Sequence, residues 1–359
     1  MTGAPDIPLF DGHNDAVQKI APFRPDDIRR FLDGGTSGHI DFPRARRGGL
    51  GGGMFAISVP SPKRPDTPDD PELRITGSGY EVRLALPVDE QTALRTAIAQ
   101  AAALIRLAAA SDGRIRIVRS VEEIETCLAT GVLAIVLHIE GAEPIGPDLA
   151  ALDLFHAAGV RSLGPVWSRP NVFGHGVPFR FPASPDTGPG LTAAGKSLVR
   201  RCNELGILID LSHLNEQGFW DVARISTAPL VATHSAAHAI CPVTRNLTDD
   251  QLAAIRDSDG LVGMNFEVSV TRPDGYDEPD TPIEVLVAGI DYLVERIGID
   301  RVGFGSDFDG ATMPTAIGDV AGLPFLLDVL RARGYDRDSL EKLACRNWLR
   351  VLRATWHAA

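Results

Sequence analysis

The stretch GILIDLSHLNEQGFWDVARISTAPLVATHSAAH, residues 206–238, contains two short apolar runs separated by an amphipathic segment of about three helical turns. The apolar runs, residues 207–211 and 229–233, each end in a polar turn that carries a histidine, His213 and His234. This order predicts a strand, a helix and a second strand. Polar residues at the ends of strands that alternate with helices are typical of a (β/α)8 barrel, in which all strand C-termini meet at one mouth. The alternative is that both histidines are ordinary loop residues.

The same pattern recurs along the whole chain. Six further apolar runs predict strands, and most of the eight strands are followed by a segment with helical periodicity. No change of composition divides the chain, so we predict an α/β fold in which residues 1–359 form a single (β/α)8 TIM-type barrel domain. The six further strands are expected at residues 7–10, 51–59, 132–137, 160–166, 260–266 and 301–305.

Local signals also predict where several helices start. Capping boxes are expected at Thr248 with Gln251 and at Thr281 with Glu284, among other places. The last helix is expected to start at Asp338 and to run to the C-terminus.

Two connections are unusually long, one after the second expected strand and one after the fourth. Residues 60–90 are rich in proline and aspartate, and their segment RITGSGYEVRL, residues 74–84, predicts a small hairpin. Residues 167–190 are dense in proline, glycine and aromatic residues. Long loops that follow barrel strands lie over the mouth, so we interpret both as walls or lids of a site. The alternatives are a solvated loop for the first and a packed surface loop for the second.

Composition excludes several classes of protein. Of the 359 residues, 44% are hydrophobic and 23% are charged, which is typical of a globular protein with a substantial core. The net charge of −12 and the lack of a basic block argue against nucleic acid or an anionic membrane as partner. The four cysteines are far apart and form no C-x-x-C pair, which indicates reduced thiols. Because neither a signal peptide nor an apolar run of about 18 residues is found, we expect a cytoplasmic protein.

Histidines and carboxylates gather at the expected strand ends. His13 and Asp15 point to the same side of an extended chain, because side chains alternate with a period of two. Glu140 directly follows a strand that is almost entirely aliphatic, too far from the next helix to cap it. The complete set at the strand ends is His13, Asp15, Glu140, His213, His234 and Asp307.

This set predicts a metal site. Imidazoles and carboxylates without thiolates suit Zn²⁺ bound through nitrogen and oxygen. Six candidate groups exceed what one tetrahedral ion needs, so we predict two divalent ions that share a bridging carboxylate. Glu140 comes from a strand that lies in the chain between His13 and the later histidines, His213 and His234, and is the expected bridge. Two ions roughly 3.5–4 Å apart can hold a hydroxide between them and lower its pKa toward neutrality.

These motifs together resemble the renal, or membrane, dipeptidase family of binuclear zinc peptidases, which are amidohydrolase-like barrels. The resemblance covers nearly the whole chain. It depends on DGHND (11–15), HIEG (138–141), LIDLSH (208–213), THSAAH (233–238), the Arg245-Asn246 pair and GFGSDFDG (303–310).

The resemblance assigns roles to these residues. It implies that one zinc ion is bound by His13 and Asp15, that the other is bound by His213 and His234, and that Glu140 bridges them. The substrate would be a dipeptide. The sequence does not decide the oligomeric state, for which a homodimer is one candidate.

The resemblance also implies roles in catalysis. Asp307 would take the proton of the attacking hydroxide and pass it to the leaving amine. Arg245 would bind the free carboxylate of the dipeptide, a role that suits a guanidinium because it pairs with a carboxylate through two hydrogen bonds.

One position departs from the family pattern. The family usually has a histidine shortly after the fourth strand, where this chain has Trp167. An indole N–H donates one hydrogen bond but neither carries a charge nor accepts a proton. His175, eight residues later, is a candidate substitute. Two alternatives to a dipeptidase therefore stay open: an amidohydrolase of N-acyl-amino acids or lactones that uses the same metals, and a metal-stabilised binding protein without turnover.

Overall fold

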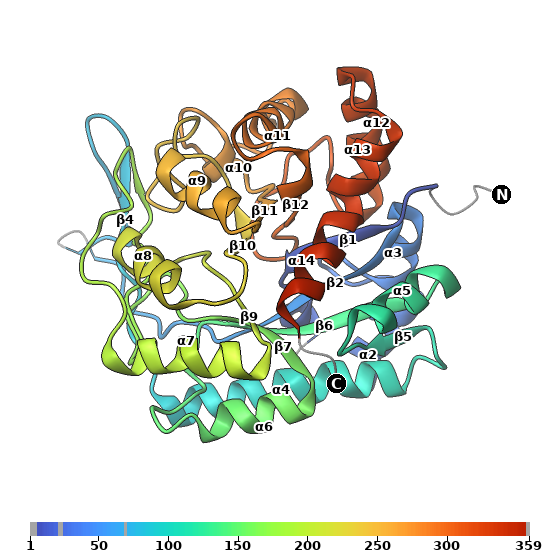
Figure 1. Cartoon of the computed structure of the whole chain (residues 1–359), viewed down its shortest axis with the longest axis horizontal. Coiled ribbons are helices and arrows are strands. Elements are labelled where there is room, and N and C mark those ends of the chain that lie inside the picture. The colour runs from blue at the N-terminus through green and yellow to red at the C-terminus, as the bar shows by residue number, and fades with distance from the viewer. Residues whose placement is uncertain (1–5, 21–23, 68–69, 357–359) are drawn as a thin grey trace.

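The computed structural model describes residues 6–20, 24–67 and 70–356, and its centre is formed by parallel strands (Figure 1). One sheet has the order β1-β2-β6-β7-β9, with β5 (Ile115–Ile117) paired to β6, and a second sheet has the order β10-β11-β12. The strands of the first sheet are β1 (Leu9–Asn14), β2 (Leu50–Ser58), β6 (Leu133–Glu140), β7 (Val160–Gly164) and β9 (Leu208–Ile209). Those of the second are β10 (Val231–Ser235), β11 (Leu261–Met264) and β12 (Val302–Phe304).

The prediction of an α/β fold with a curled parallel sheet is confirmed. Isolated parallel bridges join Asp210 to Val231 and Asn14 to Phe308, at the two places where the sheets approach each other. Closure of all eight strands into one barrel stays a prediction. The strand expected at residues 207–211 is observed only as the short β9. Beyond it the Asp210 carboxylate accepts the backbone N–H groups of Ser212 at 2.9 Å and Thr233 at 2.8 Å, and so replaces regular strand pairing.

Helices surround the strands, with α4, α6 and α7 along one side and α9, α11 and α12 along the other (Figure 1). None of the helices among the described residues is both long enough and apolar enough to cross a membrane. The first seven helices are α1 (Ala16–Ile20), α2 (Pro25–Asp33), α3 (Phe42–Gly48), α4 (Glu90–Ala109), α5 (Val121–Thr130), α6 (Ala150–Ala158) and α7 (Ala193–Leu205). The others are α8 (Glu216–Ile225), α9 (Asp249–Asp257), α10 (Val268–Thr271), α11 (Ile283–Ile297), α12 (Leu323–Arg333), α13 (Arg337–Glu341) and α14 (Asn347–Thr355). Short 3-10 turns are η1 (Ile299–Arg301) and η2 (Val320–Gly322).

The predicted helix starts were partly right. Thr248 and Gln251 form the expected capping box at the start of α9. The box expected at Thr281 is wrong, because α11 begins after Pro282 without a side-chain cap. The last helix starts earlier than expected, since Asp336 accepts the N–H of Ser339 and caps α13; a π-helical turn, η3 (Lys342–Arg346), then leads into α14.

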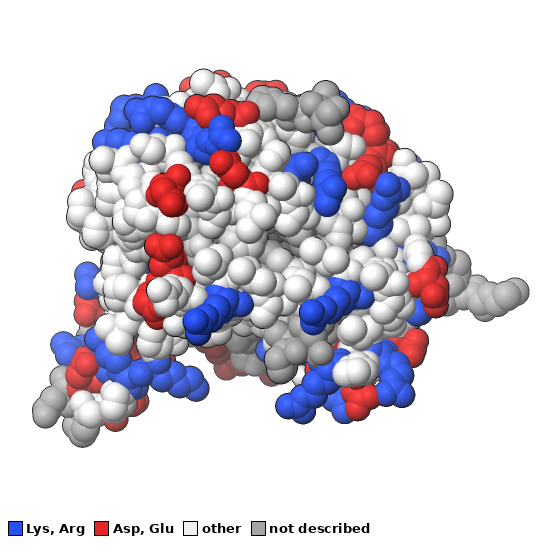
Figure 2. Space-filling view, turned by 90° about the horizontal axis from the view of Figure 1, so that it is seen from below, with Lys and Arg blue, Asp and Glu red and all other residues white. Residues whose placement is uncertain are grey.

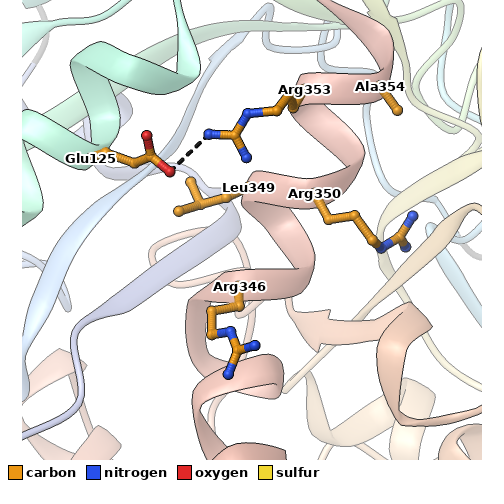
Figure 3. A pocket seen from close by; sticks show the side chains of 6 residues that line it. All are labelled: Glu125, Arg346, Leu349, Arg350, Arg353 and Ala354. Carbon is orange, nitrogen blue, oxygen red and sulfur yellow. Dashed lines mark hydrogen bonds and ion pairs between the residues drawn. The ribbon is translucent and has the colours of Figure 1, made fainter.

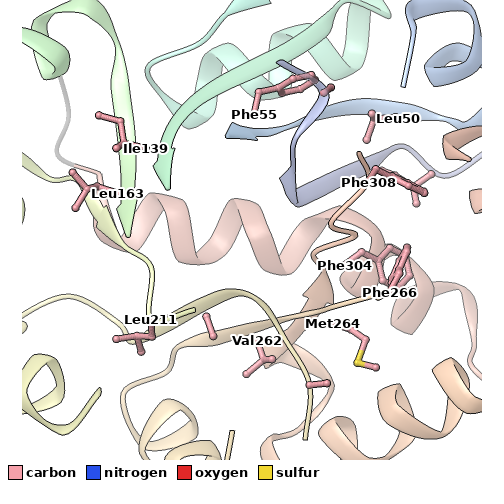
Figure 4. Packing of buried hydrophobic residues seen from close by; sticks show 14 of the residues in the cluster. Leu50, Phe55, Ile139, Leu163, Leu211, Val262, Met264, Phe266, Phe304 and Phe308 are labelled. Carbon is pink, nitrogen blue, oxygen red and sulfur yellow. The ribbon is translucent and has the colours of Figure 1, made fainter. Parts of the chain in front are cut away.

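Alternation along the strands divides the core into two clusters. Residues of one parity, such as Phe55 and Ile135, belong to a large cluster that includes helix residues and strands of both sheets (Figure 4). Residues of the other parity, such as Met54 and Val136, pack with Trp348 of α14 in a smaller cluster. Because successive strand side chains point to opposite faces, a fully apolar strand is buried on both faces.

The two long connections form a sheet of their own. The predicted hairpin is confirmed as β3 (Leu73–Ile75) and β4 (Tyr80–Val82), which pair in antiparallel fashion. The strand β8 (Arg180–Phe181), from the connection that follows β7, pairs with β4. The two loops therefore support each other at one end of the molecule.

Candidate metal centre

The side chains predicted to bind metal meet at the C-terminal ends of the strands. The Glu140 Oε1 atom lies 3.7 Å from His13 Nε2, 3.1 Å from His213 Nε2 and 3.6 Å from His234 Nε2. Asp15 Oδ2 lies 3.4 Å from His13 Nε2, and all five residues are buried. The structure thus brings together residues from four strand ends around one carboxylate.

Neighbouring side chains orient these groups. Ser168 Oγ lies 2.8 Å from His213 Nδ1, and Thr233 Oγ1 lies 2.8 Å from His234 Nδ1. Each contact leaves the Nε2 atom of its imidazole facing Glu140. Partners of this kind set the ring orientation and the tautomer of a metal-ligating histidine. Gln18 Nε2 donates to Asp15 Oδ1 at 2.6 Å, which leaves Oδ2 for the centre.

The centre fits a divalent cation. Both ring nitrogens of His13 are buried without a hydrogen-bond partner, which is costly unless another group binds them. Ligand atoms of His13, Glu140 and His234 lie within 4.8 Å of one another, and so do those of His13, Asp15 and Asp307. Nitrogen and oxygen donors in such clusters suit zinc.

Electrostatics also favour a cation at this place. Burial, helped by Arg245, lowers the pKa of His213 to about 4, so its ring is neutral, as a ligand must be. Burial disfavours the charged form of His13, but the carboxylates of Glu140 and Asp15 outweigh it and raise its pKa to about 10. The same two carboxylates, Glu140 and Asp15, would also stabilise a cation bound beside His13.

A cavity of about 320 Å³ opens beside the centre. It is lined by Glu140, His213 and Asp307, and also by Trp167, which lies 5.7 Å from the His213 ring between ring centroids. His175, the predicted substitute for the family histidine, is not among the residues that line it.

Arg245 lies beside the centre and does not line the cavity. It is 5% exposed, and it donates from Nη1 to Ser235 Oγ at 2.9 Å and from Nη2 to the His234 carbonyl at 2.7 Å. Its charge acts on the site, since it helps to lower the pKa of both His213 and His234.

Two cavity residues were missed by reasoning from the sequence. Glu267 follows β11, where burial and the Asp307 charge raise its pKa to about 7. Its position just beyond a strand end was the signal that could have found it. Arg169 is 1% exposed, and its guanidinium carbon lies 5.3 Å from the centroid of the Trp167 ring. It follows Trp167 by two residues, so strand-like alternation would have placed it on the same side.

The remaining surface offers no comparable centre among the described residues. A hollow of about 480 Å³ beside α14 contains three arginines (Figure 3). Each of them pairs with an acidic residue: Arg353 with Glu125 at 2.7 Å, Arg346 with Asp338 at 2.6 Å and Arg350 with Asp259 at 3.1 Å. Basic and acidic side chains are interspersed over the described residues of the face in Figure 2, which does not resemble the basic stripe of a nucleic-acid-binding surface.

Comparison with known proteins agrees with this geometry. The family model for membrane dipeptidase, peptidase family M19, matches residues 4–359. A metallo-peptidase from Rhodobacter sphaeroides, crystallised with a phosphinate mimic of the dipeptide L-Ala-D-Ala, is 50% identical, with a TM-score of 0.93 over 98% of this chain and 99% of its own. The crystal structure of the metallo-peptidase dipeptidase AC is also 50% identical, with a TM-score of 0.92 over 99% of this chain and 100% of its own.

A more distant relative is also a dipeptidase by name. The dipeptidase aclJ of Aspergillus oryzae is 30% identical over 98% of this chain and 79% of its own length. These findings disfavour a binding protein without turnover. The chain belongs to the membrane dipeptidase family, peptidase family M19, and is a metallo-dipeptidase hydrolase.

Proposed function

We propose that this protein hydrolyses dipeptides with two divalent metal ions and that these ions are Zn²⁺. His13 and Asp15 would bind one ion, His213 and His234 the other, and Glu140 both. The observation that carries the proposal is the position of Glu140 Oε1, within 3.7 Å of the Nε2 atoms of three histidines. A carboxylate placed in this way can bridge two ions, as binuclear hydrolases require.

The proposal includes the architecture that holds this site. Eight parallel strands, β1, β2, β6, β7, β9, β10, β11 and β12, would close into one barrel domain through the bridges at Asp210–Val231 and Asn14–Phe308. The site residues would then all lie at its C-terminal mouth, where barrel enzymes carry their chemistry. A cytoplasmic location remains a prediction from the sequence, and a homodimer remains one candidate for the oligomeric state.

Bound divalent ions would make a water molecule acidic enough to lose a proton near neutral pH and would polarise the scissile carbonyl. Asp307 would accept that proton and deliver it to the nitrogen of the leaving amino acid as the C–N bond breaks. Burial and the charges of Asp15 and Glu140 raise the pKa of Asp307 to about 6, so the carboxyl exchanges a proton readily near neutral pH. Trp167 and Phe179 line the cavity and would exclude water from it.

Metal analysis of variants tests the centre. The purified protein should contain close to two divalent ions per chain, as binuclear sites do. His213→Ala should mainly empty one site, because it removes a terminal ligand, whereas Glu140→Ala should lower the occupancy of both. Inductively coupled plasma mass spectrometry measures the metal content of each variant. Two fully occupied ions in Glu140→Ala would rule out the bridging role.

Recognition of the substrate carboxylate by Arg245 is a separate part of the proposal. Its support is position, because the guanidinium lies against the His234 carbonyl at the edge of the centre. A buried charge pair that loses one partner costs on the order of 2–5 kcal/mol, so a dipeptide amide should lose roughly 30- to 4,000-fold in kcat/KM relative to the acid. Arg245→Met should erase most of this preference and keep the metal content.

The same assay decides between the two candidate functions. If the wild-type enzyme does not distinguish acid from amide, N-acyl-amino acids or lactones, hydrolysed at the same centre, would be the better candidates for its main substrates. Trp167 is the observation that favours this alternative, because it lines the cavity where the family has a titratable histidine. Steady-state kcat/KM values for dipeptides, acyl-amino acids and lactones give the comparison. His175 would be excluded as the substitute if His175→Ala retained full activity.

A further inference from the structure

Asn265, just beyond the end of β11, contacts the carboxylate that we propose handles the proton. It is 1% exposed, and its Nδ2 atom donates a hydrogen bond to Asp307 Oδ2 at 3.0 Å. Its Oδ1 atom accepts the backbone N–H of Glu267 at 2.7 Å. A backbone N–H can only donate, so the oxygen of the amide must face Glu267 and its NH₂ group must face Asp307. The orientation of this side chain is therefore determined by its neighbours.

This hydrogen bond gives the two carboxylate oxygens of Asp307 different surroundings. Oδ2 accepts from Asn265 and is stabilised in its unprotonated form. Oδ1 lies on the other side, near the metal centre. A Cβ atom on Gly310 would meet both Asp307 Oδ1, at 2.4 Å, and Asp15 Oδ2, at 2.2 Å, so these two oxygens share one small space. Asp15 Oδ2 is the oxygen that faces His13.

We propose that Asn265 is a positioning residue that reserves the metal-facing oxygen of Asp307, Oδ1, for proton transfer. The amide holds Oδ2 as an acceptor, so the proton taken from the attacking water resides on Oδ1, the oxygen that shares its space with Asp15 Oδ2. The same hydrogen bond prevents rotation of the carboxylate, which would turn the proton away from the leaving nitrogen. The inference rests on the proposed role of Asp307 and adds the residue that directs it.

If Asn265 had only a structural role, its replacement would affect stability and turnover independently of Asp307. Asn265 also holds the chain after β11, because its backbone N–H donates to the Ser235 carbonyl at 3.1 Å. Its loss could therefore lower stability without any link to Asp307. A double-mutant cycle separates the two roles, because only residues that act together give non-additive effects.

The experiment compares Asn265→Ala and Asn265→Asp in the wild-type and Asp307→Asn backgrounds. Asn265→Asp keeps the acceptor for the Glu267 N–H but places an oxygen against Asp307 Oδ2. We expect both variants to lower kcat for a dipeptide by roughly 10–100-fold with little change in KM, because a poorly oriented general acid–base loses part of the roughly 10²–10⁴-fold that it contributes. In Asp307→Asn, the same changes should alter kcat by less than about threefold. Metal content should stay at the wild-type level.

A matched control uses a buried asparagine far from the centre. Asn347 is 3% exposed and donates from Nδ2 to the Ile299 and Val302 carbonyls at 2.7 and 2.8 Å. Asn347→Asp should lower the unfolding midpoint without affecting kcat of the folded enzyme. If the Asn265 variants do not fold, Asn265→Ser is the replacement, because its hydroxyl is too short to span to Asp307.

Any one of the following results would overturn the inference. Equal losses of kcat in both backgrounds would show a structural role alone. An unchanged kcat in the wild-type background would show no role in turnover, as would a variant crystal structure with Asp307 in the same rotamer and full activity. If Asp307→Asn itself stays within about tenfold of wild type, the proposed general acid–base fails first and the inference fails with it.

Discussion

The pKa of the Glu267 carboxyl depends on where the fold places this side chain. Its side chain accepts from Ser269 Oγ at 2.5 Å and shares the cavity with Asp307. Burial, the largest influence, and repulsion by Asp307 raise its pKa from 4.5 to about 7. The folded protein therefore binds this proton more tightly than the unfolded chain does.

Glu267→Gln should change the pH dependence of stability. Because the folded pKa is raised, the stabilisation linked to this group is present below about pH 4.5 and is lost as the pH rises through about 7. Glutamine removes that loss, so the variant should gain thermal stability relative to wild type at about pH 8 but not at about pH 5. Calorimetry of the metal-free variant and wild-type proteins at both pH values measures this gain in thermal stability. Glu284→Gln, an exposed change at the start of α11, should show no such pH-dependent gain. A gain of equal size at both pH values would contradict the assignment.

At the scale of elements, a buried ion pair links three strand-end loops. Arg169, after β7, donates from Nε to Glu143 Oε1 at 2.9 Å and from Nη1 to Ser61 Oγ at 2.7 Å. Both charged side chains are 1% exposed. Ser61 belongs to the connection after β2, and Glu143 to the turn after β6. The pair therefore holds together the loops that form one wall of the cavity.

Arg169→Met should destabilise the fold strongly, because it leaves the Glu143 charge buried without a partner. Breaking a buried pair in this way costs about 3–5 kcal/mol in the free energy of unfolding. The double variant Glu143→Leu/Arg169→Met should recover part of this loss, as both charges are then absent. Urea denaturation gives the values. Arg201→Met breaks the exposed pair with Asp153 and should cost only about 0–1 kcal/mol. A cost as small for Arg169→Met would show that water reaches the pair.

At the scale of the whole molecule, α14 carries the residue that fills the centre of the smaller core cluster. Trp348 is 0% exposed and donates from Nε1 to the Phe304 carbonyl at 2.9 Å. It packs where two strands carry glycine: a Cβ atom would lie 2.1 Å from its ring at Gly12 and 2.6 Å from it at Gly303. The C-terminal helix thus ties the first strand to the last.

Trp348→Ala should lower the free energy of unfolding by about 3–5 kcal/mol, since it empties a large space in a packed core. Gly303→Ala should also destabilise the wild type, because the three heavy atoms nearest to its new methyl group all belong to Trp348. In the Trp348→Ala background the same methyl group should be tolerated or even stabilising. Thermal denaturation of the four proteins tests this. If Gly303→Ala costs as much in both backgrounds, the glycine serves another purpose than making room for the ring.

The amino-acid sequence by itself determined the class of fold and the residues of the centre. Apolar runs with polar ends mark parallel strands, and parallel strands present their ends at one edge, so the sequence predicts that His13, Glu140 and His234 lie close together. The family resemblance depended on the same short motifs. These features are local in the chain, which is why sequence reasoning reaches them.

Only the tertiary structure decided which atoms face each other. It shortened β9 through the Asp210 carboxylate, placed Arg169 and Glu267 in the cavity, and left His175 outside it. It also set Asn265 against Asp307, a residue 42 positions away. Contacts of this kind depend on the packing of several elements at once, because a shift of one helix or loop changes them without altering any local pattern. Local periodicity can therefore predict which residues reach the mouth of the strands, but the orientation of each side chain there follows from the packing of the whole molecule.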